Sequence, residues 1–285
     1  MIRRLPVIGP ISVRAELVRR YRDAFGQPPD IASPQGFNEH IVRRILLDRD
    51  PRLRIVCDKL AVRDFICRHA GAEFVIPLLG VWKDPRAIAW EALPERFVLK
   101  PNHASGPVAI VRSAGERDLA ALSAAAARWL TLDYYDQTYE WGYRGIPRRL
   151  LAEPLLVGPD GGQAPEIQIL CFHGSARIIR VHTGAKLTSS RRDNWFDING
   201  TRLDISIDSP QGDYILSRAD LDRLLPVAQR IAAGFSHLRV DFYLTDAGPK
   251  IGELTPYHAA GRSPWNPAIW DRTLGAFWAE GAAAG

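Results

Sequence analysis

The sequence predicts an α+β fold in which a short helical region, residues 1–70, precedes two mixed subdomains, residues 71–150 and 151–285. Helical spacing dominates the first region, strands followed by one helix fill the second, and strands outnumber helices in the third. A chain of 285 residues can bury a substantial core, and 46% hydrophobic and 24% charged residues are ordinary values for a globular protein. The composition therefore argues against a fibrous repeat or a disordered chain.

The sequence carries no sign of a membrane helix, a secretion signal or a disulfide framework. No stretch reaches the roughly 18 consecutive apolar residues that a membrane helix needs, and Pro6 interrupts the N-terminus before a secretory apolar segment can form. Cys57, Cys67 and Cys171 are widely spaced with apolar neighbours, which favours buried free thiols over disulfides or a zinc cluster. We expect a cytoplasmic protein without stable membrane insertion.

The chain is basic, with 37 Lys and Arg residues against 32 Asp and Glu residues. This excess is compatible with nucleic acid, an anionic membrane surface or a polyphosphate ligand, and it does not choose among them. Because the aromatic-glycine patterns of RNA-binding modules are missing, we expect no nucleic-acid partner. The composition does not indicate an oligomeric state.

Short helices are expected in the first region, because prolines interrupt it near residues 28–34. The run 54–58, just before Lys59, has the character of a strand. Helical spacing is clearest at positions i, i+3, i+4 and i+7, which are Val62, Phe65, Ile66 and His69.

The small subdomain is expected to contain three strands and a helix. Ser113 and Glu116 have the spacing of a capping box, which predicts that the helix begins there. A small-residue loop, residues 101–107, joins the second and third strands. The strands are apolar runs rich in β-formers, at residues 76–82, 96–100 and 108–111.

The large subdomain is expected to be a sheet with two helices. Ser217 caps the first helix, in which Pro226 predicts a kink or a split, and the second lies near residues 267–280. The predicted strands are residues 149–157, 166–172, 176–182, 195–198, 202–205, 238–244 and 250–255.

The last two strands carry the sharpest chemical signal. Polar residues alternate with apolar ones in residues 238–244, so one face of that strand is polar. We expect a hairpin centred on Ala247 with a loop of residues 245–249. The residues that then face each other are Asp241 with Glu253 and Arg239 with Thr255.

The facing acids Asp241 and Glu253 are candidate metal ligands. Carboxylates on cross-strand positions repel each other unless a cation lies between them. Mg²⁺ suits such a pair, because it binds one or two carboxylates and completes its shell with water and substrate phosphates. The alternative is an acidic pair that is solvated or neutralised by Arg239.

Two of the five lysines lie where a strand or strand-like run ends. Lys59 follows residues 54–58, and Lys100 ends the strand 96–100. Ammonium groups suit phosphate oxygens, and the backbone N–H groups of the loop after Lys100 can form an anion nest. The loop matches no Walker pattern, so an ordinary hairpin turn is the alternative.

In their order and spacing, these motifs resemble the ATP-grasp fold, and more narrowly the TupA-like ATP-grasp family of polysaccharide and teichuronopeptide biosynthesis. The likeness covers about residues 20–275. The matching motifs are Phe37-Asn38-Glu39, Asp58-Lys59, Phe97-Val98-Leu99-Lys100-Pro101-Asn102-His103, Ser105-Gly106, Glu153-Pro154-Leu155-Leu156, Cys171-Phe172-His173-Gly174, Arg239-Val240-Asp241 and Gly252-Glu253-Leu254-Thr255-Pro256-Tyr257.

The resemblance implies two α+β subdomains that grip ATP. The two lysines would contact phosphates, the loop after the second lysine would close over them, and a hinge segment would read the adenine edge. Contacts with ATP would come from Lys59, Lys100, Asn102, His103, Ser105, Gly106, Glu153, Leu155 and Leu156.

The resemblance also implies a metal site and a catalytic role for two basic residues. Asp241 and Glu253 would hold Mg²⁺, and the hydroxyl of Thr255 would ligate it or orient a water. Arg239 would stabilise the transferring phosphate or the acyl-phosphate, together with Lys100.

The implied reaction is ATP-dependent ligation. A small-molecule or glycan-linked carboxylate would take the γ-phosphate of ATP, and an amine would then displace that phosphate to give an amide. This chain departs from the family at Gln168 and His40, where Lys is common, and at Thr255, where many members have Asn. His258, with Arg262, is a candidate for the acceptor side. A glycosyltransferase-like polysaccharide protein and a nucleotide-binding scaffold without turnover remain as alternatives.

Overall fold

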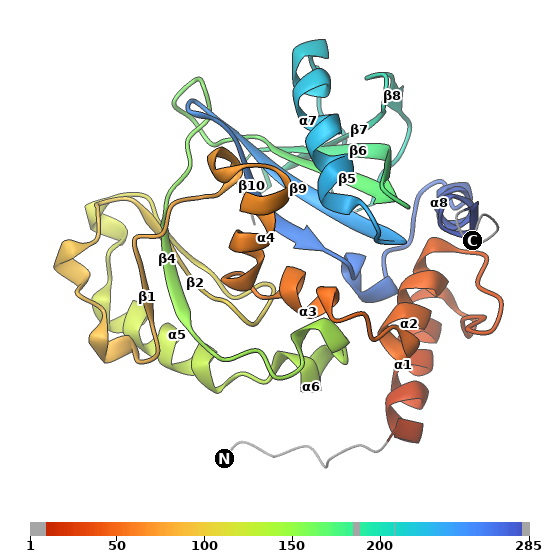
Figure 1. The fold of residues 1–285 in the computed structure, drawn as a ribbon, viewed down its shortest axis with the longest axis horizontal. Helices are drawn as coiled ribbons and strands as arrows, with labels where there is room; N and C mark the ends of the chain where they lie inside the picture. The colour runs from red at the N-terminus through yellow and green to blue at the C-terminus, as the bar shows by residue number, and fades with distance from the viewer. Residues whose placement is uncertain (1–9, 185–188, 208, 281–285) are drawn as a thin grey trace.

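The computed structural model of the chain describes residues 10–184, 189–207 and 209–280, and it contains two antiparallel sheets with helices packed against them (Figure 1). The small sheet has the order β1-β4-β2-β3, and the large sheet has the order β10-β9-β5-β6-β7-β8. The predicted α+β fold is therefore confirmed. Among the described residues, no helix is long and apolar enough to cross a membrane. The N-terminal residues used in the secretion argument lie outside the described part.

The α-helices are α1 (Pro10–Phe25), α2 (Phe37–Leu47), α3 (Arg52–Cys57), α4 (Ala61–His69), α5 (Leu119–Thr131), α6 (Tyr134–Thr138), α7 (Arg218–Ala232) and α8 (Ile269–Glu280). The strands are β1 (Gly80–Trp82), β2 (Phe97–Pro101), β3 (Ala109–Val111), β4 (Leu150–Pro154), β5 (Glu166–Phe172), β6 (Ser175–Thr183), β7 (Arg192–Asp197), β8 (Arg202–Leu203), β9 (His237–Thr245) and β10 (Gly248–Thr255).

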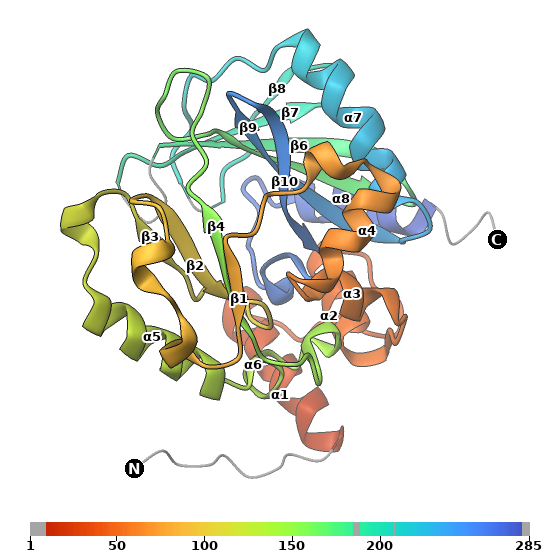
Figure 2. The same ribbon diagram turned by 60° about the vertical axis from the view of Figure 1, so that its left-hand side comes forward.

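The small sheet has a core of its own. Phe97 and Leu99 of β2 and Leu150 of β4 are fully buried, and they cluster with Leu122 and Trp129 of α5. Figure 2 shows this sheet and α5 on one side of the molecule, with the large sheet on the other. Because β4 pairs with both β1 and β2, residues 150–154 belong to the small sheet, and the chain passes to the large sheet only after β4.

The helices before β1 share the core of the large sheet. The guanidinium of Arg44, in α2, is buried and donates to the carbonyl oxygens of His237 and Pro256 at 2.7 and 3.1 Å and to Oγ of Ser236 at 2.6 Å. These acceptors lie around the start of β9 and just after β10. Burial lowers the pKa of Arg44 to about 10, although Asp48 opposes the shift. The contacts join α2 to the two strands that carry the predicted acids.

The run 54–58, predicted as strand-like, lies mainly in α3. The carboxylate of Asp50 accepts a hydrogen bond from the backbone N–H of Arg52 at 2.9 Å, at the start of this helix. Leu53, Val56 and Cys57 are buried at the i, i+3, i+4 spacing of one helical face. A five-residue apolar run fits a strand as well as a helix. The spacing of the apolar residues on either side of the run decides which of the two structures forms.

Two helix starts were predicted from caps, and one of them is confirmed. Oγ of Ser217 accepts from the N–H of Asp220 at 3.0 Å and starts α7. The helix predicted at Ser113 begins instead after Asp118, whose carboxylate accepts from the N–H of Ala121 at 3.0 Å. Residues 114–116 form a separate 3-10 turn, and the carboxylate of Glu116 accepts from the N–H of residue 112.

Pro226 and Cys67 lie on solvent-facing sides of their helices. Pro226 is an exposed residue within one helix, α7, so the predicted split is absent there. A proline removes one backbone hydrogen bond of a helix, and in α7 this loss falls on the solvent-facing side. Cys57 and Cys171 are buried free thiols, as predicted. Cys67 is exposed, contrary to the prediction, because α4 buries Val62, Phe65 and Ile66 instead.

Candidate active site

Strands β9 and β10 bring the two predicted acids together. Asp241 pairs with Glu253, and Arg239 pairs with Thr255, so both predicted cross-strand pairs are present. Facing cross-strand residues have Cβ atoms about 4.5–5.5 Å apart. The two carboxylates therefore belong to one side of one hairpin.

The hairpin reaches this pairing by a different route from the one predicted. Its turn is tighter than the expected five-residue loop, because Thr245 already pairs with Gly248. The register then shifts by one residue between Ile251 and Glu253, which makes Gly252 a β-bulge. A Cβ atom at Gly252 would lie 2.4 Å from Cε2 of Tyr243, so the bulge needs glycine. The bulge restores the predicted register beyond it.

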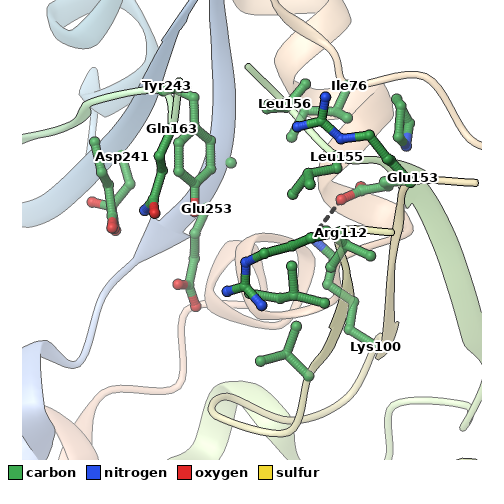
Figure 3. Close-up of a pocket in the computed structure, with 18 of the residues that line it drawn as sticks. Ile76, Lys100, Arg112, Glu153, Leu155, Leu156, Gln163, Asp241, Tyr243 and Glu253 are labelled. Atoms are coloured by element: carbon green, nitrogen blue, oxygen red, sulfur yellow. Dashed lines mark ion pairs between the residues drawn. The ribbon is translucent and has the colours of Figure 1, made fainter. Parts of the chain in front are cut away.

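A cavity of about 440 Å³ lies between the two sheets. Figure 3 shows Asp241 and Glu253 on one side of it and Lys100, Glu153 and Leu155 on the other. The segment that leaves β4 lines the cavity where the chain passes from the small sheet to the large one. The predicted residues that line this cavity are Lys59, Lys100, Ser105, Gly106, Glu153, Leu155, Leu156, Asp241 and Glu253.

Asp241 is 2% exposed and is held by Arg239. Nε of Arg239 donates to Oδ1 of Asp241 at 2.7 Å, and Nη2 donates to Oδ2 at 2.6 Å. Burial raises the pKa of Asp241 to about 6, and the nearby Glu166 and Glu253 add to the rise while Arg239 opposes it. The arginine-neutralised arrangement considered for the acidic pair is thus present at Asp241.

The donor set fits Mg²⁺ better than a metal that needs a full cage of protein ligands. No group of three or more His, Cys, Asp or Glu side chains in the described ranges is placed to hold a metal ion. Mg²⁺ requires only one or two carboxylates, with water and phosphates as the other ligands. Oε1 of Gln168 is buried without a hydrogen-bond partner, and Nε2 of the same side chain lies 3.4 Å from Asp241. An unused carbonyl oxygen therefore lies near one of the carboxylates.

Thr255 and Arg239 lie beside the pair formed by Asp241 and Glu253. Oγ1 of Thr255 accepts from Nη2 of Arg239 at 3.2 Å, and the Thr255 side chain lines a second cavity rather than the first. Nη1 of Arg239 lies 3.0 Å from Nδ1 of His258, which lines the same second cavity. Burial lowers the pKa of His258, and the neighbouring Arg239 adds to this. The imidazole therefore stays neutral beside the guanidinium.

The two lysines each use one acceptor of the protein. Nζ of Lys100 forms an ion pair with Oε2 of Glu153 at 2.6 Å, and Arg63 approaches the other oxygen of Glu153 at 3.6 Å. Nζ of Lys59 donates to the carbonyl oxygen of Ala104 at 2.5 Å. Burial lowers the pKa of Lys59, while the carboxylate of Glu253 opposes this. Since an ammonium group has three donors, both lysines keep donors for a ligand.

Asn102 and His103 support the loop and do not line the cavity. Asn102 is 1% exposed; its Nδ2 donates to Oδ1 of Asp58 at 2.8 Å, and its Oδ1 accepts from the N–H of Arg149 at 2.8 Å. His103 is buried, with Nε2 3.3 Å from the carbonyl oxygen of Leu132. Both side chains therefore hold the loop from within the protein, and neither residue is among those that line the cavity.

Several cavity residues were not identified from the sequence. Glu166 and Tyr243 line the cavity from β5 and β9, and Arg112 lines it from the end of β3. The alternation of Glu166 with Gln168, which pairs with Asp241, is a signal that identifies Glu166. Arg112 follows a short strand, and the sequence carries no comparable signal for it.

Two sheets that enclose a cavity lined by Lys59 and Lys100 and by the facing acids Asp241 and Glu253 match the ATP-grasp architecture. A family model described as TupA-like ATPgrasp matches residues 39–279. The chain therefore belongs to the TupA-like ATP-grasp family, as its motifs suggested.

Solved structures of ATP-grasp enzymes resemble the fold at low sequence identity. The chain spans little more than half the length of two D-alanine–D-alanine ligases that it resembles in structure. A search among curated proteins found no match. D-alanine–D-alanine ligase from Bacillus anthracis, in complex with ATP, is 19% identical, with 71% of this chain and 55% of that chain covered and a TM-score of 0.41. D-cycloserine synthetase DcsG is 18% identical, with 80% of this chain and 72% of that chain covered and a TM-score of 0.43. D-alanine–D-alanine ligase from Helicobacter pylori is 14% identical, with 79% of this chain and 58% of that chain covered and a TM-score of 0.44.

Proposed function

We propose that the chain is an ATP- and Mg²⁺-dependent ligase that joins a carboxylate to an amine through an acyl-phosphate. The cavity between the sheets carries this proposal, because it combines the ammonium groups of Lys59 and Lys100 with the carboxylates of Asp241 and Glu253. Lysines suit phosphate oxygens, and facing carboxylates suit the metal that accompanies a nucleotide. The D-alanine–D-alanine ligases and the D-cycloserine synthetase among the compared structures are named for related chemistry.

Each wall has a distinct part in this reaction. Leu155 and Leu156 offer backbone and apolar surface to the adenine, and Lys100 offers charge to the phosphates. Asp241 and Glu253 would hold Mg²⁺, which supplies positive charge to the phosphate oxygens when bound. Arg239 binds Asp241 and lines the second cavity, and we place the carboxylate that takes the phosphate where the two cavities meet. The protein positions and neutralises charges, so no serine or cysteine nucleophile is required.

The biological setting is proposed from the family. TupA-like ATP-grasp proteins are associated with polysaccharide and teichuronopeptide biosynthesis, so we place the reaction in cell-surface polysaccharide or peptide-conjugate synthesis in the cytoplasm. A basic chain is compatible with acidic glycan-linked substrates.

The test is nucleotide turnover by the full chain. The protein is incubated with Mg²⁺ and ATP, with carboxylic acids and with hydroxylamine, which traps an acyl-phosphate as a hydroxamate. ADP and hydroxamate are expected from the wild type and not from Glu253→Gln, whereas the matched change Glu91→Gln, at an exposed residue, leaves turnover intact. Release of a nucleoside diphosphate from a sugar nucleotide, without ADP, would instead support a glycosyltransferase. ATP binding without release of product would support a scaffold.

A further inference from the structure

A second cavity of about 350 Å³ adjoins the nucleotide cavity. The two share Ser105 and Glu253 as lining residues, so they meet beside one of the proposed Mg²⁺ ligands. Arg239 and Thr255 line the second cavity from the hairpin, and Glu140 lines it from the loop after α6. A group in the second cavity therefore lies next to the phosphate end of a nucleotide in the first.

Some charged groups of the second cavity form ion pairs within the protein, and others have no such partner among the described residues. Arg239 is bound to Asp241, and Arg180 forms a buried ion pair with Asp193. The carboxyl of Glu140 is 5% exposed, and neither it nor the guanidinium of Arg262 has a hydrogen-bond or ion-pair partner among the residues that the structure describes. Burial of a carboxyl group without a hydrogen-bond partner costs free energy. When the group lines a cavity, a ligand can supply the missing partner.

The backbone beside these groups is held in an unusual conformation. Ala259 and Ala260 have φ values of 46° and 53°, and Gly261 follows with 68°. Non-glycine residues in the left-handed region are strained, and they persist where the surrounding structure imposes them. A Cβ at Gly261 would lie 2.7 Å from the carbonyl oxygen of Asn38, so α2 packs directly against this turn. The turn carries Arg262 to the cavity.

Given the proposed ligase function, we propose that the second cavity binds the acceptor amine and that Glu140 is the base that accepts its proton. The amine nitrogen forms a bond to the acyl carbon of the acyl-phosphate, and the bond from that carbon to the phosphate oxygen breaks. Phosphate leaves with the electron pair. Because the amine enters as an ammonium ion, its nitrogen loses two protons: the first passes to the carboxylate of Glu140 and frees the lone pair that attacks, and the second leaves with the departing phosphate. The substrate class is a primary amine that enters as an ammonium ion.

The surroundings of Glu140 suit this exchange. Burial raises the pKa of Glu140 to about 8, Arg262 opposes the rise, and Glu253 adds to it. An arriving ammonium favours the ionised carboxylate, so binding drives a proton from the carboxyl and leaves a base beside the amine. The ionisable groups that interact with Glu140 are Arg262, Glu253, Cys57, Tyr134, Tyr143 and Tyr257.

The cavity also has room for a long acceptor. Ala259 and Arg262 line both the second cavity and a third of about 580 Å³, whose other lining residues belong to α1. The remainder of a glycan- or peptide-linked amine can extend along this side, with an anionic group facing Arg262.

A binding experiment tests the amine site without turnover. Ethylammonium is titrated into the full chain at pH 7 by calorimetry, in two buffers of different ionisation enthalpy, so that proton release is measured. The wild type is expected to bind and to release close to one proton. Glu140→Gln should bind at least tenfold more weakly and release none, while Glu91→Gln matches the wild type. Absence of binding to the wild type, or equal binding and proton release in Glu140→Gln, would overturn the proposal.

A turnover experiment separates this proposal from the ligase function. With an acid that supports hydroxamate formation, Glu140→Gln should keep the reaction with hydroxylamine, which is largely neutral at pH 7, and lose the reaction with ethylamine at least a hundredfold. Raising the pH should restore the variant, because the amine then loses its proton to water. Equal loss with both nucleophiles would assign Glu140 a structural part. If the wild type binds ethylammonium but never forms hydroxamate, the ligase function fails and the amine site stands.

Discussion

Arg239 donates to both carboxylate oxygens of Asp241, from a position two residues earlier on the same strand. Both side chains are largely buried, so each charge depends on the other. Removing one partner of a buried ion pair costs about 3–5 kcal/mol, since the remaining charge has no compensation. This pair therefore connects the proposed metal site with the stability of the large sheet.

We predict that Asp241→Asn loses both turnover and stability. The variant leaves Arg239 buried without its carboxylate, so the free energy of unfolding in urea should fall by about 3 kcal/mol. Magnesium-dependent release of ADP should fall at least a hundredfold. A variant with wild-type stability would show that Arg239 finds another partner, and full activity would remove Asp241 from the metal site.

Glu253→Gln should separate activity from stability. Glu253 is only partly buried, and its carboxylate has no ion pair with a basic side chain within the described residues. Its loss should therefore abolish turnover while unfolding stays within about 1 kcal/mol of the wild type. Thermal melting and ADP release, measured side by side, check this difference from Asp241→Asn.

Gly252→Ala should disturb the position of Glu253. The new Cβ would overlap the ring of Tyr243, so the bulge or the ring must move. Overpacking of this kind costs about 1–3 kcal/mol, and we expect a comparable loss in unfolding free energy. The apparent affinity for Mg²⁺, measured from the metal dependence of turnover, should weaken with it. Combining the change with Tyr243→Leu should recover part of the stability, because the smaller side chain vacates the space.

The dependence of stability on pH should reveal Glu140. Burial raises the pKa of this carboxyl from 4.5 to about 8, so its protonated form stabilises the fold fully below pH 4.5. That contribution is lost as the pH rises to about 8, at up to about 1.4 kcal/mol per pH unit. Glu140→Gln removes this slope. We expect the difference in unfolding free energy between wild type and variant to change steadily from pH 5 to 8; a constant difference would contradict the assignment.

Asn102→Leu should destabilise the chain without a direct effect on the nucleotide. The side chain bonds Asp58 and the backbone of Arg149, and leaving such buried groups unpaired costs about 1–3 kcal/mol each. Lys100→Met is the contrasting variant, because this lysine lines the cavity. We expect it to raise the Kd for ATP at least tenfold, while Asn102→Leu changes it little in protein that remains folded. Nucleotide titrations followed by fluorescence compare the two.

The sequence predicted the cross-strand pairs of the hairpin well because the signal is local. Alternation placed Asp241 and Glu253 on one face, and any hairpin of about this length brings them close. The turn and the bulge were missed, because an expected five-residue loop with regular pairing leads to the same partners. Lys59 lines the cavity although the run before it is a helix and not the predicted strand. Its contact with phosphate stays a prediction.

The rest of the site depends on contacts between distant segments. Glu140 follows a short helix and belongs to no motif. Arg262 lines the second cavity because the left-handed turn before it places it there. Asn102 lies inside a motif typical of phosphate contact, but the structure turns its amide toward Asp58. Residue type and spacing identify candidates, whereas the direction of a side chain is set by packing that the sequence pattern does not contain.

The guanidinium of Arg44 has a consequence for any shortened form of the chain. Its acceptors, at His237 and Pro256, bracket the hairpin that carries the proposed metal ligands. A fragment that begins after α2 would leave two inward-facing carbonyl oxygens and Ser236 without their donor, at the base of that hairpin. A shortened chain should therefore include α2. A fragment that begins at the small sheet would lose the hydrogen bonds of Arg44 that hold the acidic hairpin in place.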